Sequence, residues 1–285
     1  MNINYINFDN TTTFHGGKVP YFTFKNLEKL DFLRHGFSTR LGGVSNGVFS
    51  SMNLNFTRGD DRASVERNFR LIGEALGINP EDMVYARQTH TTNVMEAGYE
   101  HRGMGVTKER SFDDIDGFVT NKPGVALVTT YADCVPVFLA DPVRKAIGLA
   151  HSGWRGTVKN ITKETVRMMV SLYGCKPSDM VAFVGPSICR GCYEVGADVA
   201  KEFAAAYGEM VFDGILYPAD SNNPDGEKYR IDLHRANEAN LLNAGLKQEN
   251  IGITDVCTCC NPGLFFSHRA SKGLRGGLCG FLQIK

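Results

Sequence analysis

The sequence predicts an α+β fold (mixed α/β) in which mixed β-sheets are covered by helices. Short β-rich runs alternate with amphipathic helical segments along the 285 residues, and several β-rich runs follow one another between residues 125 and 150. A purely parallel sheet would instead place a helix after nearly every strand. No repeat, low-complexity segment or Pro/Gly/Ser-rich linker divides the chain. We therefore expect a single domain over residues 1–285, with residues 1–20 as a peripheral N-terminal segment.

Four segments are predicted to be helices, because their apolar residues recur every three or four positions. The segment 60–77 has Gly77 as a plausible stop, and its apolar face is formed by Val65, Phe69, Ile72 and Leu76. The segment 157–174 also ends at a glycine, and its stripe consists of Val158, Ile161, Thr165, Met168 and Leu172. The other two predicted helices lie within residues 194–208 and 232–246.

The predicted strands are short runs rich in β-branched and apolar residues. Three of them are consecutive and are separated by turn-like Asp-Cys and Asp-Pro pairs: "VALVTTY" at 125–131, "VPVFLAD" at 135–141 and "KAIGLAH" at 145–151. Two more, within "DMVAFVGPSI" and "NIGITDV", lie at 179–188 and 250–256.

Composition and charge exclude some classes of function. Lys+Arg and Asp+Glu both number 31, so the formal net charge is zero, and no charge run stands out. This balance argues against a nucleic-acid coat or an electrostatic membrane binder. The first residues have neither the basic nor the apolar region of a secretory signal, and no run of about eighteen apolar residues suggests a membrane span. The eight cysteines are then expected to be reduced thiols or metal ligands in a cytoplasmic protein.

Two histidines and a cysteine form the first candidate site. His90, Cys134 and His151 each lie at or near the end of a predicted strand, where sites are commonly built. Two imidazoles and a thiolate are a sound three-ligand set for Zn²⁺, which would keep a fourth position for water. The ligands are far apart in sequence, so no spacing rule selects this interpretation. A Cys-His hydrolase pair and three unrelated core residues stay open as alternatives.

The remaining cysteines form a weaker candidate. Cys189 and Cys192 make a C-x-x-C pair, and Cys257, Cys259 and Cys260 lie close together further along the chain. A structural zinc site is conceivable from two cysteine pairs, but the C-x-C-C spacing does not fit a zinc ribbon. The sequence therefore favours reduced free thiols that catalysis does not need.

Two arginines in glycine-rich turns are candidates for anion binding. Arg40 lies in "FSTRLGGVS", and Arg155 lies in "SGWRGT", just before a predicted helix. An arginine can bind phosphate as a fork, and a helix N-terminus also favours anions. Solvated turn arginines are the alternative. Common nucleotide-binding, metalloprotease, α/β-hydrolase and zinc-deaminase motifs are missing from the sequence.

Nine ordered motifs resemble those of the YfiH-like "laccase-domain" family, also known as the polyphenol oxidase or purine nucleoside phosphorylase family. They extend from about residue 35 to the end and read "HGFSTRLGGVS", "SMNLNFTRGDD", "RQTH", "DIDGFVT", "YADCVPVFLADP", "GLAHSGWRGT", "VGPSICRGCYEVG", "DLHRANEANLL" and "CTCC…FFSHR". The resemblance implies a CNF1/YfiH-like single domain, with His90, Cys134 and His151 as the metal ligands. Thr91, where the family often has glycine, and the tail "SHRASKGLRGGLCGF" depart from the family pattern.

The resemblance also implies an activity. The expected enzyme is a zinc-dependent purine nucleoside phosphorylase acting on adenosine, inosine and 5′-methylthioadenosine, with phosphate as co-substrate and with adenosine deaminase activity. In this reading His90, Cys134 and His151 are catalytic, and Arg40 and Arg155 bind phosphate. No nucleic acid or membrane is expected as a partner, and the protein would be a monomer or homodimer.

Other activities are less well supported by the residues. The family name implies copper, but a multicopper oxidase needs paired H-x-H steps for its cluster, and none of the seven histidines forms one. A cysteine hydrolase or amidase acting on cell-wall peptide precursors remains a rival, with Cys134 as nucleophile. A metal-binding protein without turnover is a second rival.

Overall fold

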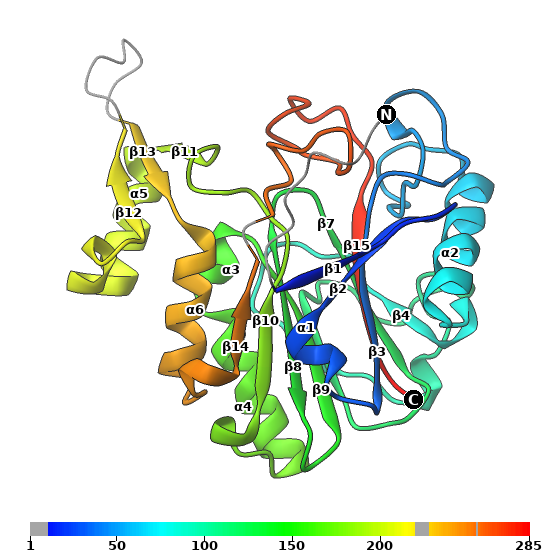
Figure 1. Cartoon of the computed structure of the whole chain (residues 1–285), viewed down its shortest axis with the longest axis horizontal. Helices are drawn as coiled ribbons and strands as arrows, with labels where there is room; N and C mark the ends of the chain where they lie inside the picture. Colours follow the sequence, from blue (N-terminus) through cyan, green and yellow to red (C-terminus); the bar gives the residue numbers. More distant parts are fainter. Residues whose placement is uncertain (1–10, 220–227, 255) are drawn as a thin grey trace.

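The computed structural model describes residues 11–219, 228–254 and 256–285. Within these ranges two six-stranded sheets form the centre of the molecule (Figure 1). The first sheet has the order β1 (Thr12–His15), β2 (Tyr21–Phe24), β3 (Leu33–Ser38), β15 (Leu278–Ile284), β7 (Ala126–Tyr131) and β4 (Met83–Tyr85). The second has the order β14 (Ile251–Ile253), β10 (Val181–Val184), β8 (Val135–Asp141), β9 (Ala146–Ser152), β6 (Gly117–Thr120) and β5 (Val94–Glu96).

Both sheets are mixed. The strand pairs β4–β7, β5–β6 and β10–β14 are parallel, whereas all other strand pairs of these two sheets are antiparallel within the described residues. The prediction of mixed sheets covered by helices is therefore confirmed. The predicted peripheral segment 1–20 falls partly on residues 1–10, which lie outside the described residues, while Thr12–His15 form the edge strand β1.

The two sheets pack face to face through an aromatic core. Phe24, at the end of β2, stacks on Phe183 of β10 with ring centroids 4.0 Å apart, and it also meets Phe138 of β8 edge-on at 4.9 Å. All three rings are fully buried. Aromatic pairs in these geometries stabilise beyond their area of contact, so this cluster joins the inner faces of the sheets.

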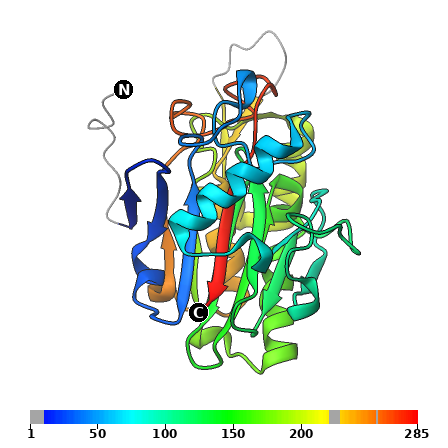
Figure 2. The ribbon, with the colours of Figure 1, turned by 90° about the vertical axis from the view of Figure 1, so that its right-hand side faces the viewer.

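Helices cover the outer faces. α2 (Arg62–Leu76) packs on the first sheet (Figure 2), while α3 (Trp154–Val158), α4 (Ile161–Tyr173) and α6 (Leu233–Asn243) cover the second. α5 (Ala197–Tyr207) packs with a small sheet of β11 (Glu194–Gly196), β13 (Lys228–Ile231) and β12 (Leu216–Pro218). The short α1 (Lys25–Glu28) follows β2. None of the helices in the described ranges has the length and apolar character needed to cross a bilayer.

The predicted helix over residues 157–174 is two helices in the structure. Asn160 has a left-handed backbone (φ 60°), and its side chain accepts a hydrogen bond from the backbone N–H of Lys163, so it caps α4 and separates it from α3. Asparagine tolerates this conformation better than most residues. The apolar stripe continues across the break, which is why the periodicity alone predicts one helix.

Candidate metal centre

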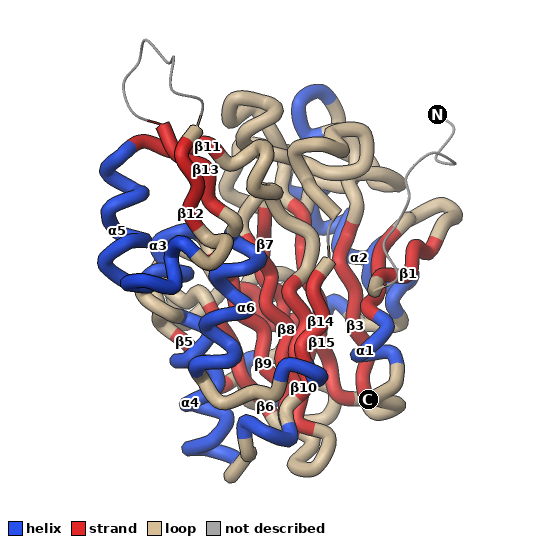
Figure 3. The backbone as a smooth tube through the Cα atoms, turned by 60° about the vertical axis from the view of Figure 1, so that its left-hand side comes forward, coloured by secondary structure: helices blue, strands red, loops and turns tan. Residues whose placement is uncertain are grey.

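The structure brings His90, Cys134 and His151 together at one end of the two sheets, where loops gather (Figure 3). Cys134 lies in the turn that leads from β7 of the first sheet to β8 of the second. His151 is the penultimate residue of β9, which pairs with β8, and His90 lies in the loop after β4. The strand expected to end at or near His90 is β4, and it ends at Tyr85, five residues before the histidine.

The three side chains are close enough to share one ion. The Cys134 Sγ lies 3.8 Å from the His90 Nε2, and the three ligand atoms all lie within 4.8 Å of one another. The His90 and His151 rings are nearly perpendicular, with centroids 4.9 Å apart. Two imidazole nitrogens and a thiolate suit a borderline-soft cation such as Zn²⁺ and do not suit Mg²⁺ or Ca²⁺, which prefer oxygen ligands.

Asp116, just before β6, positions the two histidines. Its carboxylate is fully buried and accepts a hydrogen bond from the His151 Nδ1 at 2.8 Å, which leaves the His151 Nε2 to face the thiol. The same carboxylate accepts from the backbone N–H groups of Thr89, His90 and Thr91. A carboxylate behind a histidine ligand fixes the ring and its tautomer. The sequence analysis missed Asp116, although it lies in the motif "DIDGFVT".

The charges in the cluster support one another. Burial opposes ionisation of the Cys134 thiol, but the charge and hydrogen bonding of His151, together with His90, outweigh it and lower the pKa of Cys134. Burial likewise disfavours the charged His151, but Cys134 and Asp116 outweigh it and raise the pKa of His151. Burial would raise the pKa of Asp116, yet its bond to His151 lowers that pKa to about 2. The centre is therefore prepared to hold a thiolate.

Two residues next to the ligand atoms have an uncommon backbone. His90 has φ 65° and Asp133 has φ 85°. Such conformations persist only where the surroundings fix them. Three backbone bonds to Asp116 fix the His90 loop, as described above. The Asp133 carboxylate accepts hydrogen bonds from the Thr258 hydroxyl, the Ser267 hydroxyl and the Arg269 backbone N–H. The aspartate beside Cys134 thus holds a distant loop against the centre.

Gly153 leaves the space that the centre occupies. A Cβ at this position would lie 2.7 Å from the His90 Cδ2 and 3.1 Å from the Cys134 Sγ. Any larger residue would push the ligands away, so the glycine of "HSGW" is required by close approach rather than by its own backbone conformation.

Two cavities meet at the centre. The smaller, about 100 Å³, is lined by four arginines in addition to the metal-site residues: Arg58, Arg87, Arg110 and Arg275. The larger, about 320 Å³, is lined on one side by Trp154, Ile188, Tyr193 and Leu233. Arg58, His90, Cys134 and Arg275 line both. Both cavities therefore carry arginines, and the larger one also has aromatic and aliphatic walls. His90 and Cys134 lie where the two adjoin, and His151 lines the smaller one.

The two arginines singled out in the sequence have different positions. Arg155 lines the larger cavity and stacks on the Trp154 ring, with 4.3 Å from its Cζ to the ring centroid. Arg40 lines neither cavity: its guanidinium donates to the carbonyls of Ser50 and Pro262 and stacks on Phe266. Arg40 therefore lies away from the centre. Its donors are used to hold the Ser50 and Pro262 loops together.

Arg275 is a cation that the sequence analysis missed. Within the described part of the chain its buried Nε has no hydrogen-bond partner, and its Nη1 donates only to the neighbouring Gly276 carbonyl. Burial and the nearby charge of Arg58 lower the pKa of Arg275 to about 10. A buried cation facing another cation is costly unless an anion joins them. The glycines around it in "KGLRGG" resemble those around Arg40 and Arg155, so the signal was present.

The fold and the site together define a protein with a candidate metal centre at one end of two facing, helix-covered sheets. The family described as "Multi-copper polyphenol oxidoreductase laccase" has a model that matches residues 34–285, and the chain belongs to this family. The family membership expected from the motifs is thus confirmed.

Relatives of known structure or name agree with this assignment. The chain is 35% identical over 253 residues to "Purine nucleoside phosphorylase YlmD" of Bacillus subtilis (strain 168), covering 88% of each chain. It is 34% identical over 250 residues to "Adenosine deaminase RL5" of an unknown prokaryotic organism, covering 85% of this chain and 93% of that one. The crystal structure of YlmD from Geobacillus stearothermophilus superposes with a TM-score of 0.87 at 30% identity, covering 95% of this chain and 98% of that one.

The word "multi-copper" does not fit the donor set. Within the described ranges, two groups of three or more His, Cys, Asp or Glu side chains converge, and one of these contains cysteines alone. The other has only His90 and His151 as histidines. A copper cluster that reduces oxygen needs more imidazoles than these two supply.

Proposed function

We propose that the protein is a zinc-dependent purine nucleoside phosphorylase that cleaves adenosine, inosine and 5′-methylthioadenosine, and that also deaminates adenosine to inosine. The observation that carries the proposal is that His90 and Cys134 lie where an arginine-lined cavity adjoins one with aromatic walls, with His151 beside them. The names of two relatives support both reactions. The cytoplasm, where free thiols persist, is the proposed compartment.

The smaller cavity is the proposed phosphate site. Its arginines offer fork-shaped donors that match a phosphate dianion. The buried Arg275 Nε has no acceptor among the described residues, so it can donate to a bound anion. Arg58 and Arg275 line both cavities, so an anion between them would also lie beside a ligand in the larger cavity. Arg155 would approach from the larger cavity, which it lines.

The larger cavity is the proposed nucleoside site. Trp154 and Tyr193 offer aromatic faces on which a purine can stack, and Ile188 and Leu233 exclude water from it. Its volume of about 320 Å³ is of the size that accommodates a small ligand. The ribose would then lie toward the centre, within reach of phosphate on the arginine side.

The ligands and Asp116 would prepare the centre for both reactions. A bound Zn²⁺ would supply Lewis-acid chemistry and lower the pKa of a water molecule, which suits hydrolytic removal of the purine amino group. His151 is oriented through its Nδ1 by Asp116, and Cys134 is held as a thiolate beside the two imidazoles. For phosphorolysis, the arginines would orient the attacking phosphate and keep its charge close to the ribose.

A purine nucleoside panel with and without phosphate tests the proposal. With phosphate, adenosine should give adenine and ribose 1-phosphate; without it, only inosine should form. Chromatography of the products alongside elemental analysis of the protein measures both halves. If no free base is released from any of the three nucleosides, the phosphorylase assignment fails.

A cysteine hydrolase is the second candidate, because one observation favours it. The lowered pKa of Cys134 and the raised pKa of His151 describe a thiolate–imidazolium pair, which is also the resting state of a cysteine nucleophile. The two functions differ in metal content. A metal-free preparation that hydrolyses cell-wall peptide amides and is inactivated by alkylation of Cys134 would favour the hydrolase.

A further inference from the structure

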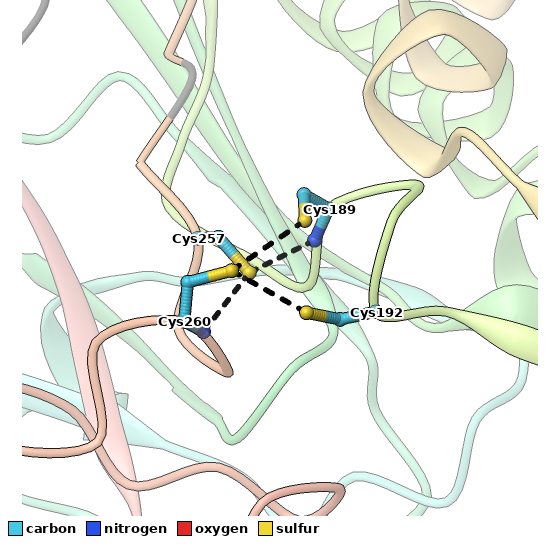
Figure 4. Close-up of side chains that lie close together, drawn as sticks. All are labelled: Cys189, Cys192, Cys257 and Cys260. Carbon is cyan, nitrogen blue, oxygen red and sulfur yellow. Dashed lines mark hydrogen bonds between the residues drawn. The ribbon is translucent and has the colours of Figure 1, made fainter.

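Four cysteine side chains converge at a second place in the fold (Figure 4). The Sγ atoms of Cys189, Cys192, Cys257 and Cys260 all lie within 4.8 Å of one another. Cys260 is 3.4 Å from Cys192 and 3.9 Å from Cys189, measured between sulfurs. In a tetrahedron of sulfurs around Zn²⁺ with bonds of about 2.3 Å, neighbouring sulfurs are about 3.8 Å apart. The cluster therefore has the dimensions of a tetrathiolate site.

Two C-x-x-C turns supply the four sulfurs. Cys189 and Cys192 lie between β10 and β11, and Cys257 and Cys260 lie in the segment after β14. In the second group, Cys257 and Cys260 form a C-x-x-C pair, and Cys259 does not belong to the cluster. Reading the group as C-x-C-C therefore missed the spacing that matters. The thiols are free, as the sequence predicts, but four of them converge in one cluster, and two C-x-x-C pairs are a strong zinc signal.

Backbone groups are arranged around the sulfurs as in a metal knuckle. The Cys257 Sγ accepts hydrogen bonds from the backbone N–H groups of Cys189, at 3.2 Å, and Cys260, at 3.4 Å. The backbone N–H of Cys192 closes the first turn by donating to the Cys189 carbonyl at 3.0 Å. Donors aimed at a sulfur stabilise a thiolate, and only a thiolate is a metal ligand.

Two arginines that donate to the first turn would balance part of the charge. Four thiolates and one Zn²⁺ leave two negative charges. The Cys192 carbonyl accepts a hydrogen bond from Arg269, and the Gly191 carbonyl accepts one from Arg230. Both cations therefore lie beside the first turn. Partial compensation of this kind lowers the cost of a charged site.

We propose that these four cysteines bind a structural zinc ion that fastens two loops of the active-site cavity to each other. Ile188 and Tyr193, which flank the first turn, line the larger cavity. Thr258, in the second turn, donates to the Asp133 carboxylate next to Cys134. The site has four protein ligands, so it is closed and has no position for substrate. Its role is to hold the cavity wall in shape.

Metal content of a variant series tests the proposal. The wild type should contain about two zinc ions per chain, Cys134→Ala about one, and Cys134→Ala combined with Cys192→Ser almost none. Cys259→Ser is the matched control, because it removes a thiol that neighbours Cys192 but is not one of the four ligands, and it should keep about two. In Cys134→Ala, cobalt substitution should give the intense absorption of a tetrahedral tetrathiolate, which Cys192→Ser should abolish.

Each alternative outcome contradicts the site. The proposal is wrong if Cys134→Ala holds no metal, or if it takes up cobalt without a thiolate spectrum. Both outcomes are measured in Cys134→Ala alone, so they do not depend on whether Cys192→Ser folds. A disulfide between any two of the four cysteines, detected by mass spectrometry in protein purified anaerobically, would also overturn it. Neither result bears on the proposed nucleoside chemistry, which depends on the other centre.

Discussion

Asp116 is the residue on which the geometry of the metal centre depends most. One carboxylate fixes the ring of His151 and, through backbone N–H groups, the loop that carries His90. Without its negative charge, the loop would lose its common acceptor and His151 would lose the partner that selects its tautomer. Asp116 lines neither of the two cavities at the centre, so its effect on substrate would act through the two histidines.

Asp116→Asn should weaken zinc binding at the centre by about 10- to 100-fold, because an amide is a poorer acceptor and carries no charge. Competition with a chelator, followed by elemental analysis, measures the loss. Asp198→Asn, on the exposed side of α5, is the matched control and should bind zinc as the wild type does. Equal affinity in both variants would show that Asp116 does not position the ligands.

Arg275→Gln should lower adenosine phosphorolysis about thirtyfold relative to deamination, since a charge-assisted contact to phosphate is worth about 2 kcal/mol. Arg155→Gln provides the comparison: if Arg155 also contacts phosphate, the same ratio falls, and if it only supports Trp154, both rates fall together. Initial rates with and without phosphate give the ratio. An unchanged ratio in Arg275→Gln would remove the smaller cavity as the phosphate site.

The residues of the candidate metal centre could be selected only partly from their type and position in the sequence. His90, Cys134 and His151 stood at expected strand ends, but nothing local showed that the ends meet, and the motifs of the family had to select them. Asp116 could not be separated from Asp113 and Asp114 by residue type. Arg275 could not be ranked above Arg40, because which arginine has free donors depends on the carbonyls that the fold places nearby.

At the scale of elements, periodicity worked where one face of a helix is buried. α2 follows its predicted span closely, with Asp61 accepting from the Ser64 N–H at its start and Gly77 in a left-handed conformation at its end. β8 matches "VPVFLAD" residue for residue. β15 was not predicted as a strand, because the glycines of "LRGGLCGF" indicate a turn and the pairing partners of a central strand are remote in sequence.

His35 of β3 makes the stability of the first sheet dependent on pH. Its Nε2 accepts a hydrogen bond from the Phe24 backbone N–H at 2.9 Å, and burial lowers the pKa of His35 to about 4. The neutral ring is needed in the folded state, so its contribution is complete above the unfolded pKa of about 6.5 and is lost as pH falls toward 4.

Between about pH 7.5 and pH 5, His35 should therefore cost the wild type about 2 kcal/mol of unfolding free energy. His35→Gln keeps an acceptor but cannot be protonated, so its stability should fall less over the same range. Urea unfolding at the two pH values gives the change in unfolding free energy for each protein. The contributions of other titrating groups cancel when the two changes are subtracted. If the unfolding free energies of both proteins fell equally with pH, His35 would not contribute to the pH dependence of stability.

At the scale of the whole molecule, β15 holds the first sheet together. It pairs with β3 on one side and β7 on the other, and all seven of its residues are buried. Deleting residues 278–285 should abolish cooperative unfolding, because it divides the sheet and exposes buried residues of the neighbouring strands, such as Phe37 of β3 and Leu127 of β7. Circular dichroism during a urea titration measures this, with deletion of Lys285 alone as the control. A truncated chain that still unfolds cooperatively would contradict this role.

The place of β15 also bears on how the protein is made. A ribosome releases β3 and β7 long before the strand that belongs between them, so two sheet edges stay open until β15 emerges. Contacts between positions so distant in sequence form slowly. The surroundings of the Cys134 thiol are also completed late, because the loop that Asp133 anchors begins at Thr258. The nascent chain therefore carries an incomplete centre until residues 258–269 have been made, and its unpaired strand edges can meet other chains in that time.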